Sequence, residues 1–406
     1  MLVRRGGRHY SLARELSAKG YSVFIFCASS FHDSEVPGIE EDNDVVVKKD
    51  GAVSYVHIRA RPYKGNGMAR ILNMLDYYRG VLRAADSFAN PDVIIGSSVH
   101  PLAHRAALRL ARRYDCKCVI ETRDLWPETL VVYGYLKDDG MLAKLLYANE
   151  RRTYERADAL IFTMEGGSQY IQEKGWDVQS GGNINTEKIH HINNGVDLEA
   201  FRRNKEEHEC SIDILNARNG RAKVVYAGSI RKVNGLSFLV EAANEMRQDD
   251  IDIVVVGGGE ELDGLRDAAK ARNIDNIVFT GPVPKCDVPA VLDKAQLLLL
   301  YSSSQTELSR YGMSQNKLFD YLASGKPILS NLPSAYSVIN KHACGIERSF
   351  DSPAEFAQAI RDMISDQEAM KRWGENSEAT AELYSFKRHA DHLIEIIESI
   401  TGEEKK

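Results

Sequence analysis

No apolar run in this 406-residue sequence approaches the ~18 residues of a membrane-spanning helix, and the longest strongly apolar stretch centres on residues 297–300. The first residues do not combine a basic start, an apolar stretch and a cleavage site, so we expect a chain that is not secreted. Cysteine is scarce and scattered, and its six residues form no CxxC pair. The pattern favours a reduced cytoplasmic protein without structural zinc.

A strongly basic half is also absent. The chain has 52 basic and 58 acidic residues, for a net charge of −6, and the acidic excess falls in residues 201–406. Proteins that coat nucleic acid are basic, so that function is excluded. No repeat of solenoid length is visible. An apolar content of 43% is ordinary for a soluble fold, and the length predicts two domains.

Short β-branched runs alternate with stretches of helical spacing, twice over. Such alternation is typical of doubly wound parallel sheets. The sequence therefore predicts an α/β protein of two Rossmann-like domains that face each other across a cleft, with ligands at the carboxyl ends of the strands. The predicted strands are 21–27, 53–58, 92–96, 117–121 and 159–163, then 223–228, 251–256, 276–280, 297–300 and 328–329.

The first strand of the first domain is a special case. Only residues 1–5 precede Gly6 and Gly7 and the helix predicted at 9–19. A doubly wound domain normally opens with a full strand, because losing a central strand exposes its neighbours. The first strand is therefore either short or incomplete, and we expect a missing segment of about ten residues.

Residues 314–329, SQNKLFDYLASGKPIL, carry the strongest functional pattern. They predict a loop, a helix that begins near Lys317, and a small-residue turn into a strand. The N–H groups at a helix N-terminus bind anions, and Lys317 adds positive charge. Asp320 can accept hydrogen bonds from vicinal hydroxyls. A sugar nucleotide fits both features, but an ordinary helix capped by 323–325 explains the sequence equally well.

Three other strand ends carry weaker features. Gly228 permits close backbone approach to a ligand. Arg231 and Lys232 follow where they can reach a phosphate, although a polar surface loop is the alternative. Glycines 257–259 lack the spacing of a dinucleotide fingerprint. The turn at 280–284 has backbone groups that can contact a base edge.

Residues 121–130, ETRDLWPETL, place Arg123, Asp124 and Glu128 at the carboxyl end of a strand in the first half. Charged side chains at that position face the ligand cleft of an open sheet. A helix N-terminus capped by Asp124 is the alternative, and both interpretations can hold.

Residues 59–83 carry six basic residues against one acid, with apolar residues at helical spacing. Such a helix can lie on an anionic membrane surface, but more often it packs its apolar face on its own core.

Together these stretches resemble the retaining family 4 glycosyltransferases of GT-B architecture over nearly the whole chain. The resemblance also includes GGRHYSLARELSAKGYSV near the start and INNGVDLEAF at 192–201. RDLWPE, NGL and NKLFDYLASGKP are similar to bacterial transferases of N-acetylated amino sugars in surface-polysaccharide assembly. The resemblance implies a nucleotide-diphospho-sugar on the C-terminal domain, an acceptor on the N-terminal domain, retention of configuration, and no metal or other cofactor.

The resemblance also implies residue roles. Cations would meet the charge that builds on the leaving diphosphate near the 311–314 loop, Asp320 would bind the ribose, and the backbone near Val283 would contact the base. The predicted catalytic residues are Asp124, Arg123 and Lys317. The predicted donor-binding residues are Gly228, Ser229, Arg231, Lys232, Asn234, Val283, Tyr311, Gly312, Met313, Ser314, Asn316 and Asp320, and the acceptor-binding residues are Gly6, Gly7 and Glu128.

The sequence departs from the family at three places. The family's two glutamates, with seven residues between them, map to Gly312 and Asp320. Its phosphate-binding Arg and Lys map to Ser229 and Asn234, and Arg231 is the candidate substitute. A histidine of many relatives maps to Arg123, so Asp124 becomes the expected polar residue on the acceptor side.

We expect an N-terminal acceptor domain at 1–200, with a C-terminal helix at 385–406 packed back on it, and a nucleotide-sugar domain at 201–384. The expected reaction moves an N-acetylated amino sugar from a UDP-sugar to a polyprenyl-diphosphate-linked or other saccharide, for lipopolysaccharide or capsule. The expected location is the cytoplasm, at the inner membrane face, with contact through 59–83. A non-catalytic binding module and a UDP-sugar epimerase or hydrolase remain open alternatives.

Overall fold

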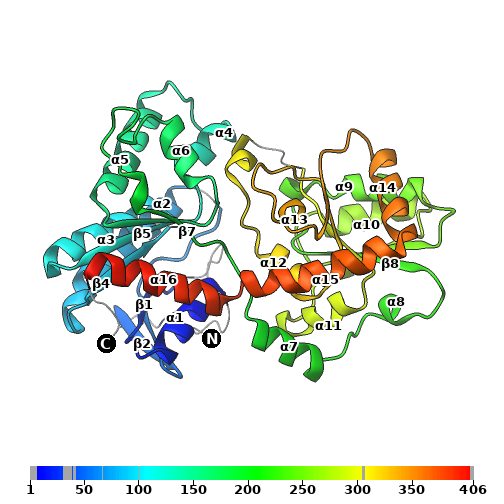
Figure 1. Cartoon of the computed structure of the whole chain (residues 1–406), viewed down its shortest axis with the longest axis horizontal. Helices are drawn as coiled ribbons and strands as arrows, with labels where there is room; N and C mark the ends of the chain where they lie inside the picture. The colour runs from blue at the N-terminus through cyan, green and yellow to red at the C-terminus, as the bar shows by residue number, and fades with distance from the viewer. Residues whose placement is uncertain are drawn as a thin grey trace. The chain divides into compact units, whose positions relative to one another are not determined.

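The computed structural model describes residues 7–30, 39, 43–65, 67–98, 100–303 and 307–402, which form two compact units (Figure 1). Unit 1 contains the described residues up to Asn193 and from Phe386 onward, and unit 2 is Asn194–Ser385. The expected junction at 200/201 falls inside helix α7 (Leu198–Glu207). Unit 2 begins earlier because Val196 already pairs with Ser385.

Unit 2 is built on a parallel sheet with the strand order β10-β9-β8-β11-β12-β13. The five strands predicted for this half are confirmed to within one residue. The short strand β13 was not predicted, because Gly345 opens it and only three residues form it. The strands are β8 (Ala222–Ala227), β9 (Ile251–Val256), β10 (Ile277–Gly281), β11 (Leu297–Leu300), β12 (Ile328–Ser330) and β13 (Gly345–Glu347).

Helices cover both faces of this sheet, so alternate residues of one strand enter different cores. Val224 and Tyr226 of β8 belong to one apolar cluster, and Val225 belongs to the other. Among the helices, α12 ends at Ala323 and Gly325 adopts φ +67°, so the helix end that the alternative interpretation places at 323–325 is present. The helices after α7 are α8 (Asp213–Asn216), α9 (Ser237–Glu245), α10 (Leu262–Ala271), α11 (Val288–Asp293), α12 (Asn316–Ala323), α13 (Val338–Lys341), α14 (Pro353–Ser365) and α15 (Gln367–Leu383).

Unit 1 contains two sheets, β1-β3-β2 and β4-β5-β6-β7. Strand β2 runs antiparallel to β3, whereas the other described pairs are parallel. The expectation of an incomplete first strand concerns residues 1–6, which lie outside the described residues. The strands are β1 (Phe24–Ala28), β2 (Val45–Asp50), β3 (Val53–Ile58), β4 (Val93–Ser97), β5 (Lys117–Thr122), β6 (Ala159–Phe162) and β7 (Ile189–His191). Two α/β units built mainly on parallel sheets confirm the predicted fold class.

The first and the last described helices pack together in unit 1. Helix α16 packs on α1, where Leu12, Phe386 and Ala390 form an apolar cluster. Lys19 and Asp391 add an ion pair at 2.6 Å. The helices of this unit are α1 (Arg8–Ala18), α2 (Met68–Ala84), α3 (Pro101–Tyr114), α4 (Glu128–Val132), α5 (Met141–Arg156), α6 (Gly167–Glu173) and α16 (Phe386–Thr401).

Helix α2 contains most of the basic stretch 59–83. Its residues Tyr77, Tyr78 and Leu82 pack against the core of unit 1, whereas Met68 and Ile71 are exposed. The apolar face of this helix is therefore largely committed to its own fold. Within the described part of the chain, no helix is both long and apolar enough to cross a bilayer.

Candidate functional site

Three strand-end loops of unit 2, which follow β8, β9 and β10, are interlocked. The Ile230 N–H donates to the Gly258 carbonyl at 2.9 Å, and the Gly257 N–H donates to the Gly281 carbonyl at 2.9 Å. A Cβ on Gly257 would lie 1.8 Å from the Gly228 carbonyl oxygen, so glycine is required for this close approach. Glycines 257–259 therefore serve the packing of the loops, which agrees with their lack of a dinucleotide fingerprint.

Lys317 lies in the first turn of α12, beside the loop after β8. Its Nζ donates to the Tyr226 hydroxyl at 3.1 Å and lies 4.3 Å from the centroid of that ring. Desolvation of the ammonium group lowers the pKa of Lys317 to about 7. In the part of the chain that the structure describes, no carboxylate forms an ion pair with this amine. A desolvated amine in that position attracts a negatively charged ligand.

Asp320 follows Lys317 by three residues, so the two side chains share one face of α12. Desolvation raises the pKa of Asp320 to about 6. The next residue fixes this turn to the sheet, because the Tyr321 hydroxyl accepts from the Ala227 N–H at 2.8 Å. The helix therefore carries a cation and an acid one turn apart near the carboxyl end of β8, and the cation whose charge acts on Asp320 is Lys285.

Asn234 closes the loop after β8. Its side-chain oxygen accepts from the Ser229 hydroxyl at 3.2 Å and from the Arg231 N–H at 3.3 Å. Arg231 and Lys232 are exposed, and the Lys232 N–H donates to the Glu260 carboxylate at 3.1 Å. The structure thus groups the predicted residues of this loop, with two cations at its exposed rim.

The loop before α12 contains four predicted residues. Tyr311 is buried, and Gly312 adopts φ +99°, a conformation that favours glycine over the glutamate of the family. Met313 is half-buried. The carbonyl oxygen of Ser314 accepts from the Asn194 side chain at 2.6 Å. Sequence reasoning missed Asn194, although it stands in the INNGVD stretch that carries the family resemblance.

Two further predicted residues lie at the margins of this group. Val283 follows β10, is half-buried and packs against the apolar core beneath. Asn316 is the first residue of α12 and is exposed. The structure places both on the same loop side of the sheet as Lys317.

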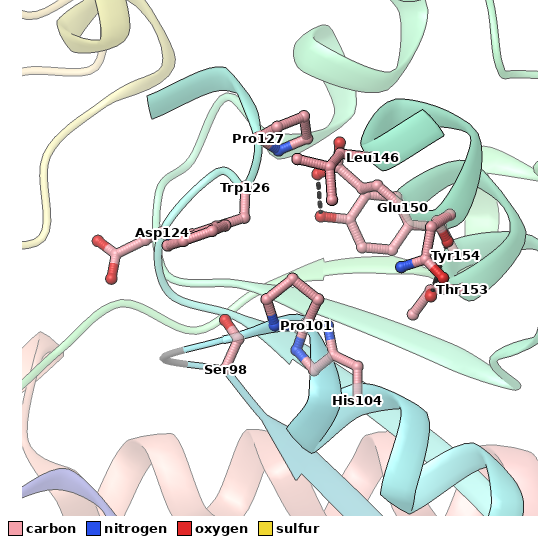
Figure 2. A pocket seen from close by; sticks show the side chains of 11 residues that line it. Ser98, Pro101, His104, Asp124, Trp126, Pro127, Leu146, Glu150, Thr153 and Tyr154 are labelled. Atoms are coloured by element: carbon pink, nitrogen blue, oxygen red, sulfur yellow. Dashed lines mark hydrogen bonds between the residues drawn. The ribbon is translucent and has the colours of Figure 1, made fainter. Parts of the chain in front are cut away.

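Unit 1 has a hollow of its own, with an empty volume of about 390 Å³ that includes the solvent at its mouth. The start of α3, the segment before α4 and one face of α5 form its wall. Figure 2 shows the Trp126 ring between Asp124 and the side chains of α5, with the Asp124 carboxylate directed away from the others. The lining residues are Ser98, Pro101, His104, Asp124, Trp126, Pro127, Leu146, Asn149, Glu150, Thr153 and Tyr154.

The predicted acceptor-side residues fall into different environments. The Asp124 carboxylate keeps access to solvent at the hollow, yet nearby protein displaces enough water to raise its pKa. The Arg123 N–H donates to the Ser98 hydroxyl at 3.3 Å, and its buried Nε has no partner among the described residues. Glu128 is not among the residues that line the hollow, and its carboxylate pairs with Lys174 at 2.5 Å. Helix α4 begins at Glu128, so Asp124 is not its cap.

Glu150 lines the hollow, and no sequence pattern indicates it. It is buried at the wall of the hollow, where the hydroxyls of Tyr154 and Tyr170 each donate to it at 2.8 Å. Burial raises the pKa of Glu150 to about 8, so it is largely protonated at neutral pH. Nearby His104 is held neutral, because burial lowers its pKa to about 4. The hollow is therefore polar but carries little charge inside.

The N-terminal end of α1 meets the same edge of the sheet. Gly7 caps this helix with φ +92°, whereas Gly6 lies outside the described residues. The buried Glu121 at the end of β5 pairs with Arg8 at 2.6 Å. Burial alone would raise the pKa of Glu121, but the charges and hydrogen bonds of Arg8 and His9 together outweigh it and hold the pKa well below its usual range. This ion pair positions α1 against the sheet.

Three side chains of the kinds that bind metal ions lie together elsewhere in unit 2. They are His208, Cys286 and Asp287. The imidazole of His208 lies 2.8 Å from the Asp287 carboxylate, and the Cys286 thiol donates to the same carboxylate at 3.5 Å. These internal contacts account for all three groups. The expectation of no metal stays a prediction.

Two protein families match the chain in tandem. Residues 6–180 match the family described as "Glycosyl transferase 4-like domain", and residues 208–380 match "Glycosyl transferases group 1". Each match falls within one of the two units, and together they extend over most of the sequence.

Similar proteins include TuaH of Bacillus subtilis, named as a proposed teichuronic acid biosynthesis glycosyltransferase, at 25% identity over 62% of this chain and 58% of that protein. Another is O-antigen chain mannosyltransferase C of Escherichia coli, at 26% identity over 47% of this chain and 50% of that protein. The chain spans about half the length of the curated relatives it matches.

Among solved structures, the fold is similar to an E. coli chain described as trehalose-6-phosphate bound with UDP-2-fluoro glucose. The TM-score is 0.72 at 10% identity, and the superposition covers 100% of this chain and 98% of the other. At that identity the likeness establishes the fold.

Proposed function

This chain belongs to the family 4-like glycosyltransferases of GT-B fold, and on that premise we propose that it transfers a sugar from a nucleotide-diphospho-sugar to a saccharide acceptor in bacterial polysaccharide synthesis. The similarity to proteins of teichuronic acid and O-antigen synthesis supports this setting.

The observation that carries the proposal is the pair of Lys317 and Asp320 on α12. The amine has no acid partner among the described residues, and it stands in the first turn of a helix whose N–H groups favour anions. The acid follows one turn later. A nucleotide sugar joins a diphosphate directly to a ribose, so one ligand can contact both a cation and an acid one helical turn apart.

The chemistry follows from charge. As the sugar leaves, negative charge grows on the diphosphate, and preorganised cations stabilise it without a metal ion. Lys317 is the inner cation, and Arg231 and Lys232 at the exposed rim are the outer ones. We propose that Arg123 and Asp124 act on the acceptor at the hollow of unit 1. Transfer with retention of configuration belongs to this proposal.

The proposed donor is a UDP-linked N-acetylated amino sugar, and the proposed acceptor is a lipid-linked or other saccharide at the cytoplasmic face of the membrane. The bound UDP-2-fluoro glucose of the similar fold supports UDP. The motif resemblance of RDLWPE and NKLFDYLASGKP supports the amino sugar.

The function is tested by thermal unfolding with UDP, GDP, ADP, TDP and their common sugars, followed by assays of nucleotide release with and without saccharide acceptors. A ligand that binds only the folded state raises stability by RT ln(1 + [L]/Kd), about 2.7 kcal/mol at a hundredfold excess over Kd. We expect a shift with UDP and one UDP-sugar, and release that requires an acceptor. Acceptor-independent conversion would identify an epimerase or hydrolase, and binding without turnover would identify a binding module.

Affinity for the UDP-sugar should be highest between pH 6 and 7. The bound diphosphate favours protonated Lys317, whose pKa is about 7 without ligand, so binding above that pH must take up a proton. The ribose hydroxyls favour ionised Asp320, whose pKa is about 6 without ligand. Binding below that pH must therefore release a proton. On both the alkaline limb above pH 7 and the acid limb below pH 6, the affinity should fall by up to about tenfold per pH unit.

Calorimetric titration with a UDP-sugar measures this profile, because its diphosphate diester keeps a constant charge over the range. Lys317→Met should flatten the alkaline limb, and Asp320→Asn should flatten the acid limb. A profile unchanged by either variant would remove both residues from the binding site.

A further inference from the structure

Large apolar side chains are exposed together at one place in unit 1, the turn before α5 and the first turns of that helix. The exposed fractions are 75% for Tyr135, 81% for Met141, 56% for Leu142 and 62% for Leu145. Removing such side chains from water is favourable, so a cluster of this kind marks a surface that something else covers.

The opposite side of α5 holds the helix in place. Ala143, Glu150 and Tyr154 are buried there, and Leu146 and Asn149 line the hollow. The internal face therefore contains hydrogen-bonded polar groups, whereas the outward face begins with apolar ones. The fold itself does not explain the outward residues, because the hydrogen bonds and packing of the inward face already fix the helix.

The outward face forms one stripe that changes character along the helix. We define the α5 stripe as the exposed residues of this helix, which are Met141, Leu142, Lys144, Leu145, Ala148, Arg152 and Arg156. Its first half is mainly apolar, and its cations are Lys144, Arg152 and Arg156. Neither acid of α5 is exposed, since Glu150 is buried and Glu155 is half-buried and pairs with Arg151. The exposed acids nearest in sequence, 138 and 139, precede the helix.

We propose that the α5 stripe docks on a lipid bilayer with anionic headgroups. A helix that lies in the membrane interface buries an apolar face and meets anionic lipid with Lys and Arg. Tyr133 and Tyr135 in the preceding turn add side chains that suit the boundary between water and hydrocarbon. Figure 1 shows α5 at the margin of unit 1.

Charge favours a lipid surface over a second copy of this chain. A symmetric pair of stripes would bring Lys144, Arg152 and Arg156 of both copies together, and like charges in contact are unfavourable. An anionic bilayer suits both halves of the α5 stripe, because its hydrocarbon receives the apolar half and its headgroups pair with the basic half. The same helix lines the hollow, so docking would hold a lipid-linked acceptor close to that hollow. This last consequence rests on the proposed function, whereas the docking does not.

The test is flotation of the full chain with vesicles of phosphatidylcholine, alone and mixed with phosphatidylglycerol. We expect binding to the mixed vesicles at low salt. Combined Met141→Ser, Leu142→Ser and Leu145→Ser should weaken partition by about tenfold or more, because the inserted apolar area is lost. Lys144→Gln, Arg152→Gln and Arg156→Gln should each weaken it by roughly fivefold, an effect that high salt removes.

A matched control carries Val47→Ser and Leu383→Ser, which remove exposed apolar side chains elsewhere. Thermal unfolding and UDP binding of every variant should stay at the level of the unmodified chain. The proposal is overturned if the chain does not bind mixed vesicles, or if the serine variant binds as well as the control. Sedimentation that shows a dimer lost in the serine variant, without vesicle binding, would assign the stripe to a second copy. Vesicle binding without nucleotide binding would overturn the proposed function and leave the docking in place.

Discussion

Replacing Lys317 by methionine should lower kcat/KM for acceptor-dependent UDP release by a factor on the order of 10²–10³. The amine is the desolvated cation of α12, and it meets the charge that develops on the diphosphate in the transition state. Methionine keeps the length of the side chain and its contact with the Tyr226 ring but removes the charge. The deficit should shrink above pH 7, because desolvation makes the unligated lysine largely neutral there.

The matched control is Lys270→Met, an exposed lysine in the last turn of α10. It changes net charge equally, and its helix turn leads into the amino end of β10 rather than into the loops at the carboxyl ends. We therefore expect activity within about twofold of the unmodified enzyme. Activity of Lys317→Met within threefold of the control would show that this amine does not stabilise the leaving group.

The second large effect concerns the ribose. Asp320→Asn should weaken UDP-sugar binding by roughly 10–100-fold, because a hydrogen bond to a charged group contributes about 1.5–3 kcal/mol. The unmodified chain should also bind UDP more tightly than 2′-deoxy-UDP, since a site built around a hydroxyl rejects the analogue that lacks it. In the variant that preference should largely disappear. Calorimetry with UDP and 2′-deoxy-UDP on the unmodified chain and on Asp320→Asn measures how far the preference for the 2′-hydroxyl depends on Asp320.

Asp267→Asn provides the control for charge, as an exposed acid of α10. It should leave the affinity and the ribose preference intact. If Asp320→Asn instead binds both nucleotides as the unmodified chain does, the ribose assignment is wrong, whatever the outcome for Lys317.

The strands of unit 2 could be predicted because buried parallel strands are short apolar runs bounded by loops. β9 and β11 are buried along their whole length, and their bounds equal the predicted ranges 251–256 and 297–300. β2 of unit 1 was missed, since Lys48, Lys49 and Asp50 remove the apolar pattern from half of it. An antiparallel edge strand with a solvated face carries no such signal.

The candidate site was predictable only where its residues are neighbours in sequence. Lys317 and Asp320 share a helical face by spacing alone. Asn194, in contrast, binds Ser314 across 120 residues of chain, and no local pattern indicates that contact. Glu150 looks like a surface acid of an amphipathic helix, and only the fold shows that two tyrosine hydroxyls enclose it.

The packing of α16 on α1 has a consequence for synthesis on the ribosome. Unit 2 is one continuous segment, Asn194–Ser385, so all of it has been made before the last helix appears. Unit 1 is translated first, yet its apolar cluster of Leu12, Phe386 and Ala390 closes only when α16 leaves the exit tunnel. The half made first is therefore completed last, and Leu12 on α1 lacks these two apolar partners while the other half folds.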